Sequence, residues 1–296
     1  MTSIASSLLC RTALSFVSAA AMAFAANAAP GDTHDKNQYT LFNPVPVGQL
    51  RDLNSDRPDL TEGPFTVDAG HLQVEFDFVN FTYDHDTTDG ADTYTRAWQI
   101  APVNFRIGLC NRSEFDLILE TFNYVRTDDK IAGTKTFQRG FGDVTMRLKV
   151  NFWGNDGGDT AFGFIPFVKI PTSQDNLGNN SVEGGVIFPL AVELPAGWDM
   201  GMMTEFDFDR DAADANYHTE FINSISVSHD IAGHLSGYLE FFSLVSTEAG
   251  SDWVGSVDGG LLYLLTKNVQ FDAGVNVGVT PAAPDFQVFT GLTVRF

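Results

Sequence analysis

Apolar and polar residues alternate along the last eleven positions of the chain. One face of this segment carries Phe286, Val288, Leu292, Val294 and Phe296. The other face is mainly polar, with Gln287, Gly291, Thr293 and Arg295. A period of two predicts a β-strand that lies between two different environments. A strand of this kind that ends on phenylalanine is typical of bacterial outer-membrane β-barrels.

The same alternation recurs in about twelve segments after Gly70. They are 71–84, 92–109, 113–127, 140–153, 159–170, 182–194, 197–209, 217–229, 233–247, 252–266, 268–279 and 286–296. Segments of about ten residues or more are long enough to cross a membrane as tilted strands. The pattern therefore predicts an all-β fold, a transmembrane antiparallel up-and-down β-barrel of about 12 strands over residues 70–296. A soluble β-sandwich array is the alternative, although it would normally carry more turn residues and fewer exposed aromatic ones.

The connections between these segments fall into two groups. If the N-terminus starts in the periplasm, long outer and short inner connections should alternate. The outer connections would be 85–91, 128–139, 171–181, 210–216, 248–251 and 280–285. The inner connections would be 110–112, 154–158, 195–196, 230–232 and 267. The first group is longer on average. An even number of strands also returns Phe296 to the periplasm, where we expect the barrel-assembly machinery to recognise it.

The residues before the barrel divide into two parts. Residues 1–28 have the pattern of a secretory signal peptide, with the single charge of Arg11, an apolar run and a cleavage site at Ala26-Asn27-Ala28. Residues 29–69 contain five prolines and little periodicity. This second part predicts an irregular periplasmic lead-in or a short plug.

The composition narrows the class of protein. The chain has 17 Lys and Arg against 38 Asp and Glu, a net charge of −21. Loss of residues 1–28 would leave 16 basic and 38 acidic residues, a net charge of −22. Such acidity argues against nucleic acid, because binding to phosphates needs clustered Lys and Arg. No run of about 18 apolar residues predicts an inner-membrane helix. Cys110 would be the remaining cysteine, without a partner for an internal disulfide.

The alternation assigns many charged residues to the inside of the barrel. The opposite register would place charges in hydrocarbon, at roughly 2–4 kcal/mol for each Lys or Arg at the bilayer midplane. The candidates for a pore lining are Arg147, Lys149, Lys169, Glu183, Glu193, Glu205, Asp207, Glu240, Asp258, Asp272 and Arg295. They could line a selective pore, which would favour cations because acids are in the majority. They could equally form a packed network of ion pairs that fills the lumen, since twelve strands lie between filled eight-stranded barrels and open porins.

Near the outer ends of three strands, aromatic residues take the inward parity. They are Phe81, Tyr83, Phe122, Tyr124 and Phe242. One interpretation is an aromatic vestibule that receives a hydrophobic solute. The other is a β-bulge, which would reverse the parity and return the rings to the lipid as an aromatic girdle. We favour the bulge.

The lead-in carries three charged residues, Arg57, Asp59 and Glu62, beside Leu60 and Phe65. A solvated linker would leave these two large apolar side chains in water. We therefore expect the three charged residues to anchor this segment inside the lumen against opposite charges.

No set of residues predicts a metal site, a cofactor or catalysis. Acids crowd two outer connections as Asp84, Asp86, Asp89 and Asp92, and as Asp207, Asp209, Asp211 and Asp214. Neither cluster has the spacing of a calcium loop. His234 and Ser236 have the spacing of a barrel esterase, but no orienting Asn or Asp shares their strand face. We therefore expect that the protein is not an enzyme.

Several motifs resemble those of a known family. Residues 56–67 read DRPDLTEGPFTV, residues 70–75 read GHLQVE, and GFGDV and FVKIPT follow at 140–144 and 167–172. They resemble a bacterial family named for the meta-cleavage pathway of phenol degradation, whose members open with RPDFTESP and GHLQLE. Gly63 departs from the usual serine. The resemblance covers the chain from about residue 51 to the end. It implies an outer-membrane barrel of a kind often called a transporter.

One function and two alternatives follow. We expect a passive outer-membrane channel or transporter for small hydrophobic or aromatic compounds, surrounded by outer-membrane lipid and lipopolysaccharide. A structural or surface-interaction barrel with a filled lumen is the first alternative. A membrane-embedded hydrolase is the second.

Overall fold

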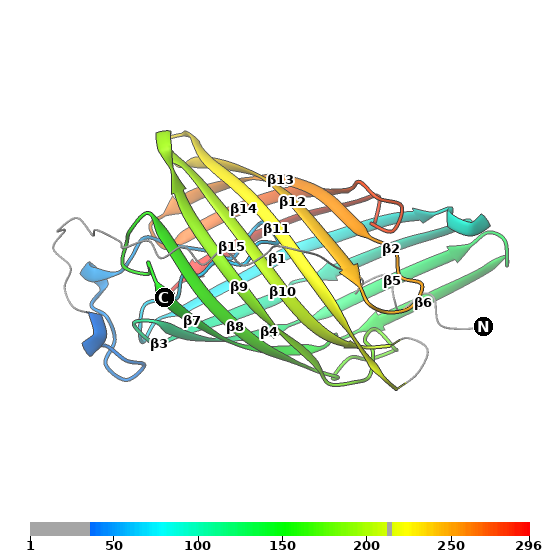
Figure 1. Cartoon of the computed structure of the whole chain (residues 1–296), viewed down its shortest axis with the longest axis horizontal. Helices are drawn as coiled ribbons and strands as arrows, with labels where there is room; N and C mark the ends of the chain where they lie inside the picture. Colours follow the sequence, from blue (N-terminus) through cyan, green and yellow to red (C-terminus); the bar gives the residue numbers. More distant parts are fainter. Residues whose placement is uncertain (1–35, 212–214) are drawn as a thin grey trace.

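Antiparallel strands make nearly all of the regular structure (Figure 1). The computed structural model describes residues 36–211 and 215–296, so the expected signal peptide at residues 1–28 lies outside the described residues. The strands are β1 (Leu72–Asp86), β2 (Thr93–Ile100), β3 (Val103–Cys110), β4 (Ser113–Leu119), β5 (Phe122–Asp129), β6 (Thr134–Gly140), β7 (Val144–Trp153), β8 (Thr160–Ile170), β9 (Glu183–Leu194), β10 (Trp198–Arg210), β11 (Tyr217–Ala232), β12 (Leu235–Ser246), β13 (Val254–Thr266), β14 (Val269–Gly278) and β15 (Phe286–Arg295). Short 3-10 helices are η1 (Lys36–Gln38), η2 (Val47–Gln49), η3 (Thr88–Gly90) and η4 (Pro195–Gly197). Within the described residues, no helix has the length and apolar character needed to cross a membrane.

The strands form one closed sheet. Neighbours pair in the order β15-β14-β13-β12-β11-β10-β9-β8-β7-β4-β3-β1-β2-β5-β6, and β15 pairs with β1. β2 and β3 are two parts of one interrupted wall strand. The same holds for β4 and β5, and for β6 and β7. Counted in this way, the wall has the twelve strands that the alternation predicted. We call the end that carries Phe296 the C-terminal end, and the end with the longer connections the distal end.

The interruptions coincide on neighbouring strands. Between β2 and β3, Ala101 has a positive φ of 52°, and Pro102 has no N–H to donate to a sheet. The Thr121 hydroxyl, between β4 and β5, donates to the carbonyl of Ala101 at 2.9 Å. Because the breaks are aligned, the distal parts of these strands form a separate section with the end of β1. Within it, β6 pairs with β5 alone.

The predicted outer connection 128–139 is wrong. Most of it belongs to the hairpin of β5 and β6, in which residues 123–129 pair with residues 134–140. This hairpin projects beyond the rest of the wall, and residues on both faces of β6 are exposed. Its sequence therefore lacks the apolar alternation by which the other strands were recognised.

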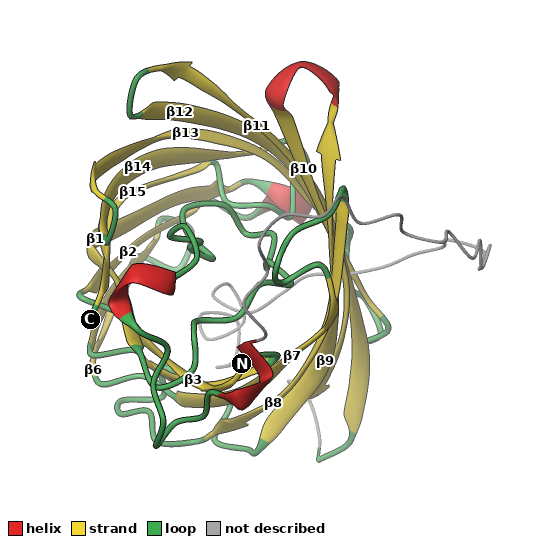
Figure 2. Ribbon diagram, turned by 90° about the vertical axis from the view of Figure 1, so that its left-hand side faces the viewer, coloured by secondary structure: helices red, strands yellow, loops and turns green. Residues whose placement is uncertain are grey.

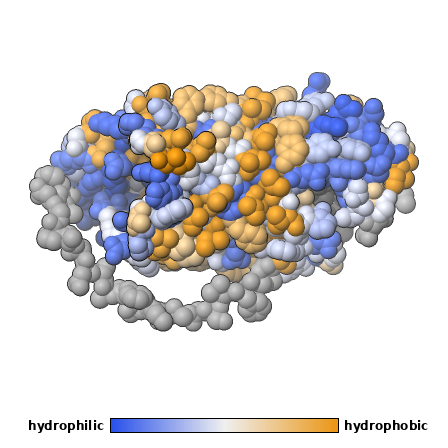
Figure 3. Space-filling model, turned by 90° about the horizontal axis from the view of Figure 1, so that it is seen from above, coloured by the Kyte–Doolittle hydropathy of each residue, from blue (hydrophilic) through white to orange (hydrophobic). Residues whose placement is uncertain are grey.

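The two faces of the wall follow the predicted parity. Lys149 and Asp272 turn inward and are buried, whereas their neighbours Leu148 and Phe271 turn outward and are 42% and 40% exposed. Figure 3 shows the result on one side of the molecule, with apolar residues across the middle and hydrophilic residues toward the ends. An apolar band between polar ends is the outer surface that a membrane barrel requires.

Candidate functional site: the lumen and the segment inside it

Part of the chain before β1 lies inside the barrel and crosses the lumen (Figure 2). We call residues 51–69 the lumen segment. The Ser55 hydroxyl lies 2.8 Å from that of Thr293 on β15. The Pro64 carbonyl accepts a hydrogen bond of 2.9 Å from the Asn151 side chain on β7. The lumen segment is therefore attached to separate parts of the wall.

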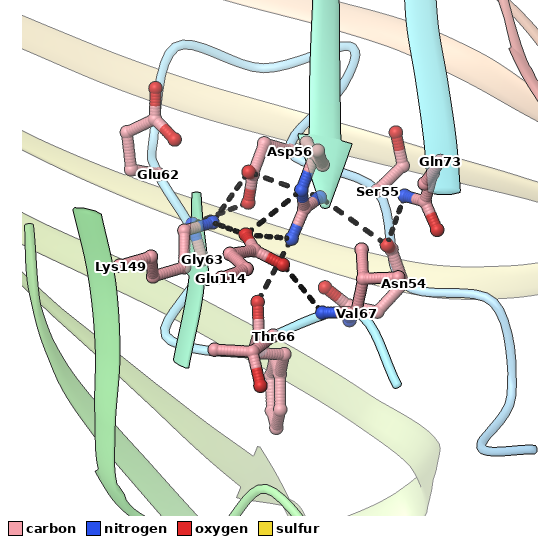
Figure 4. Close-up of polar contacts among 12 residues, drawn as sticks. Asn54, Ser55, Asp56, Glu62, Gly63, Thr66, Val67, Gln73, Glu114 and Lys149 are labelled. Carbon is pink, nitrogen blue, oxygen red and sulfur yellow. Dashed lines mark hydrogen bonds and ion pairs between the residues drawn. The ribbon is translucent and has the colours of Figure 1, made fainter. Parts of the chain in front are cut away.

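The most buried attachment is a cluster of charges around Arg106, of which Figure 4 labels Asp56, Glu114 and Lys149. The Arg106 guanidinium lies 2.8 Å from carboxylates of both Glu75 and Glu114, and 3.0 Å from the carboxylate of Asp56. Lys149 also contacts Asp56, and its ammonium lies 3.4 Å from Glu114. Wall strands supply four of these groups and the lumen segment supplies Asp56.

Within this cluster, the carboxylate of Asp56 helps to neutralise Arg106 and Lys149 of the wall. Burial by itself raises the pKa of Asp56, but the charges of Arg106 and Lys149 outweigh it and hold the pKa below its usual value. Asp56 is therefore ionised at neutral pH. Loss of such a buried partner typically costs about 3–5 kcal/mol, because a charge is left without compensation.

The three residues expected to anchor the segment are placed in two ways. Arg57 lies 2.6 Å from carboxylates of both Asp77 and Asp272, and Glu62 pairs with Arg147. These two residues face opposite charges. Asp59 is different, because Glu240 is its neighbour.

Burial raises the pKa of Asp59 well above its usual value, and the charge of Glu240 raises it further. Asp59 therefore retains a proton to higher pH than an exposed aspartate does. Glu240 also accepts hydrogen bonds from the main-chain N–H of Leu60, at 2.8 Å, and from the hydroxyl of Thr61. This part of the lumen segment is held by hydrogen bonds.

The predicted pore-lining residues divide according to whether they touch the lumen segment. Those that do so are Arg147, Lys149, Glu240, Asp272 and Arg295, which donates to the carbonyl of Arg51. Of the others, Lys169 pairs with Glu183, and Glu205, Asp207 and Asp258 are turned inward and largely buried, whereas Glu193 is exposed near the C-terminal end. Ion pairs of Arg147, Lys149 and Asp272 and hydrogen bonds of Glu240 and Arg295 thus connect the lumen segment to the wall.

A β-bulge in β1 determines which face of the wall most of the vestibule candidates occupy. The register between β1 and β15 shifts between Asp77 and Val79, so the residues beyond Phe78 change face. Phe81 and Tyr83 then lie beside Phe286 on the outer face, with ring centroids 6.2 and 5.4 Å away.

The same outer row continues across the distal section. Trp98 lies 5.0 Å from Phe81 and 5.4 Å from Tyr124, and Phe122 is 44% exposed on the same face. An inward vestibule made by Phe81, Tyr83, Phe122 and Tyr124 is therefore wrong. The bulge returns these rings to the outside, where they form an aromatic girdle.

Phe242 is the exception, because it faces the lumen. It is 9% exposed and belongs to an apolar cluster in the distal half of the barrel. Its strand neighbour across the sheet is Ser224, whose hydroxyl lies 2.6 Å from that of Thr61 in the lumen segment. We call the apolar cluster that contains Phe242 the distal apolar cluster. It comprises Ile165, Ile187, Met203, Ile222, Phe242, Leu244, Val254 and Ala283.

At the C-terminal end, a cavity of about 1020 Å³ opens beside the lumen segment. Polar and charged residues predominate in its lining, among them Arg51, Asp68 and Asp156. The Arg51 guanidinium lies 2.8 Å from the carboxylate of Asp156 and 3.2 Å from that of Asp68. This mouth of the barrel is therefore hydrophilic, in contrast to the distal apolar cluster.

The other candidates for chemistry lie apart from the lumen segment. The Ser236 hydroxyl donates to Asp230 at 2.8 Å, and the His234 ring packs against Tyr263, so these two do not pair with each other. At the distal end, Asp211 and Glu248 in the connections and His218 on β11 bring possible ligand atoms within 4.8 Å of one another. His85 pairs with Asp92.

Arg106, Glu114 and the members of the distal apolar cluster other than Phe242 were not anticipated from the sequence. Arg106 has the inward parity of β3, but Pro102 had to be recognised as a break before that parity could be used. The cluster was hidden because β9 is apolar on both faces around Ile187. In such a strand, alternation does not distinguish the inside from the outside.

Comparisons with known proteins agree with this architecture. The COG4313 outer membrane channel from Pseudomonas putida F1 superposes with a TM-score of 0.60 and 11% identity, over 82% of this chain and 100% of that one. The NanC porin gives a TM-score of 0.49 at 10% identity, over 75% and 98%. A search of curated proteins finds no match. A family model described as "Putative MetA-pathway of phenol degradation" matches residues 55–296. The chain is therefore a member of this MetA-pathway phenol-degradation family, and its fold is that of an outer-membrane β-barrel.

Proposed function

We propose that the protein is a passive outer-membrane channel for small hydrophobic or aromatic compounds. The observation that carries this proposal is the distal apolar cluster. The side chains of this cluster are at most 9% exposed and form an apolar region on the inner side of the wall. Pockets for apolar ligands are lined by side chains of this kind. We further propose that a signal peptide directs the chain to the outer membrane and that Phe296 is recognised during barrel assembly.

The position of the cluster suggests the order of contacts along the pathway. Ala283, in the connection between β14 and β15, is buried against the cluster. A solute that enters from the distal end would displace this connection and occupy the apolar surface. Glu240, two residues from Phe242 on β12, binds the lumen segment. The solute would next meet that segment, which must shift before the solute can reach the hydrophilic mouth.

The filled structural barrel is the competing function, and the buried ion pairs of the lumen segment favour it. The two differ in permeability. Purified protein in planar bilayers should conduct ions, and proteoliposomes should pass small solutes, if the channel proposal is correct. Silent bilayers together with impermeable liposomes would establish the filled barrel instead.

The substrate class needs a separate experiment. Cells that lack the gene would be complemented with the wild type, with Phe242→Ser or with Ile131→Ser, and the initial uptake of radiolabelled toluene would be measured. Ile131 is 69% exposed in the β5–β6 turn, so its exchange is a matched control. We expect slower uptake with Phe242→Ser only. Equal uptake in all three strains would remove the apolar cluster from the pathway.

A further inference from the structure

The outer face of the distal section carries an unusual set of residues. Residues directly opposite each other on antiparallel strands project to the same face. One such row is Tyr83, Arg96, Arg126 and Phe137, across β1, β2, β5 and β6. The next row toward the distal end is His85, Tyr94, Asp128 and Lys135. The row on the other side is Phe81, Trp98, Tyr124 and Arg139.

Cations are concentrated on this face. Five of the 17 Lys and Arg of a chain with net charge −21 lie here. They are Arg96, Arg126, Lys135 and Arg139 in the three rows, and Lys130, whose ammonium lies 5.2 Å from the centre of the Tyr94 ring. Asp128 is the only acid in the three rows, and the nearby Asp92 is paired with His85. The face therefore has a marked positive excess.

The two arginines are held in fixed positions. The guanidiniums of Arg96 and Arg126 lie 3.1 and 2.9 Å from the carboxylate of Asp128. The Arg126 guanidinium also stacks 5.7 Å from the centre of the Phe137 ring. The side chains of Arg96, Arg126 and Lys135 are nevertheless 33%, 36% and 59% exposed. They are positioned by Asp128 but still have N–H groups directed at the surroundings.

The height of these cations relative to the membrane follows from the girdle. Trp and Tyr gather where hydrocarbon meets head groups, and Trp98 and Tyr124 occupy that level here. Successive rows are two residues apart, roughly 7 Å along a strand. Arg96 and Arg126 therefore lie one row beyond Trp98 and Tyr124, level with Tyr83 at the distal edge of the girdle, and Lys135 lies two rows beyond Trp98 and Tyr124. At this height an outward-facing side chain meets lipid head groups of the distal leaflet.

We propose that this face binds the phosphate groups of lipopolysaccharide in the outer leaflet, with Arg96, Arg126 and Lys135 as the principal ligands. Guanidiniums bind phosphate oxygens through two parallel N–H groups, and the preset planes of Arg96 and Arg126 suit that geometry. The girdle beneath them contacts the acyl chains of the same molecule. A phosphorylated lipid satisfies both parts of the surface, whereas free phosphate satisfies only the upper one. This inference is independent of the proposed transport.

The test uses full-length folded protein in detergent and two forms of one short-chain lipopolysaccharide, with and without its lipid A phosphates. We expect the wild type to bind the phosphorylated form more tightly. Arg96→Gln/Arg126→Gln should bind it about 30-fold more weakly, at roughly 1 kcal/mol for each basic residue near a lipid surface. Arg112→Gln/Lys267→Gln removes the same charge from exposed turns at the C-terminal end and should bind as the wild type does.

Three results would overturn the proposal. They are equal affinity of the wild type for both lipid forms, equal affinity of the two double variants, and full competition by inorganic phosphate at the concentration of the lipid. The comparison of lipid forms needs no variant, so it remains decisive if a variant fails to fold. Arg96→Lys/Arg126→Lys keeps the charge but loses the two-point geometry, and we expect intermediate binding.

Discussion

Arg57 and Asp272 form an ion pair through two contacts inside the barrel, although 215 positions separate them in the sequence. The Arg57 Nε and Nη2 atoms lie 3.1 and 2.6 Å from the two carboxylate oxygens of Asp272. Arg57 belongs to the lumen segment and Asp272 to β14. The same guanidinium contacts Asp77 on β1, so one side chain connects the segment to strands on both sides of β15.

Replacement of Arg57 should destabilise the protein strongly. Arg57→Met would leave two buried carboxylates without their shared cation, and we expect a loss of about 3–5 kcal/mol in the free energy of unfolding at neutral pH. Urea unfolding in detergent, followed by tryptophan fluorescence, would measure it. Arg112→Met, on an exposed turn, should change little. An Arg57→Met protein as stable as this control would show that the pair contributes nothing.

A single methyl group should loosen the lumen segment. At Gly108 on β3, an added Cβ would lie 2.2 Å from the main-chain oxygen of Asp68, so Gly108→Ala must push the segment away from the wall. Gly48→Ala is the control, because nothing lies within 4 Å of the added atom. We expect Gly108→Ala to raise single-channel conductance in planar bilayers. Conductance equal to that of Gly48→Ala would mean that the segment does not limit permeation.

The pH dependence of stability should change when Asp59 is replaced. Because the pKa of Asp59 is raised in the folded protein, the folded state keeps a proton that the unfolded state releases. The contribution of this group is complete below its ordinary pKa of 3.8 and is lost as pH rises through the folded pKa. Asp59→Asn should therefore gain stability relative to the wild type as pH rises above about 4.

Thermal unfolding in detergent at several pH values would measure this gain. Asp252→Asn, at an exposed position, should follow the wild type. If the difference between Asp59→Asn and the wild type does not vary with pH, then Asp59 is ionised in both states and the explanation from burial is incorrect.

The bulge at Phe78 can be tested by the surroundings of two adjacent positions. In a background with Cys110→Ser, a nitroxide attached at Phe81→Cys should be accessible to oxygen dissolved in lipid. At Asn80→Cys it should be accessible to a water-soluble nickel reagent, because the Asn80 side chain bonds to Gln287 on the inner face, at 2.8 Å. If the nickel reagent reached the label at Phe81→Cys and oxygen reached the label at Asn80→Cys, Phe81 would face the lumen and the inward vestibule would be correct.

Alternation predicted the barrel well because nearly every strand of a membrane wall must turn apolar residues to the lipid and polar residues inward. Charged residues on β7 and β14, such as Lys149 and Asp272, can only face inward. The number of strands followed, since each segment is long enough to cross. The family resemblance, carried by residues 56–67 and 70–75, was confirmed by the match to residues 55–296.

Alternation failed where the rule changes within a strand. One extra residue at Phe78 reverses all later positions of β1, and a pattern with a period of two does not reveal where that residue is inserted. Beyond the apolar band, residues on both faces of β6 are exposed, so no hydrocarbon enforces alternation there. The contacts of Asp59 depend on Glu240, which is 181 positions away, and only the folded chain brings them together.

The wall closes where the chain ends. The N–H of Phe296 donates to the carbonyl of Leu72 at 2.8 Å, and the His71 ring lies 2.8 Å from the carbonyl of Phe296. Residues 71–296 thus complete the ring, and the lumen segment adds no strand to it. The circumference of the barrel and the width of the passage through it are consequently determined by different parts of the chain. Evolution can alter the passage by editing a short N-terminal stretch, while the surface presented to the lipid stays as it is.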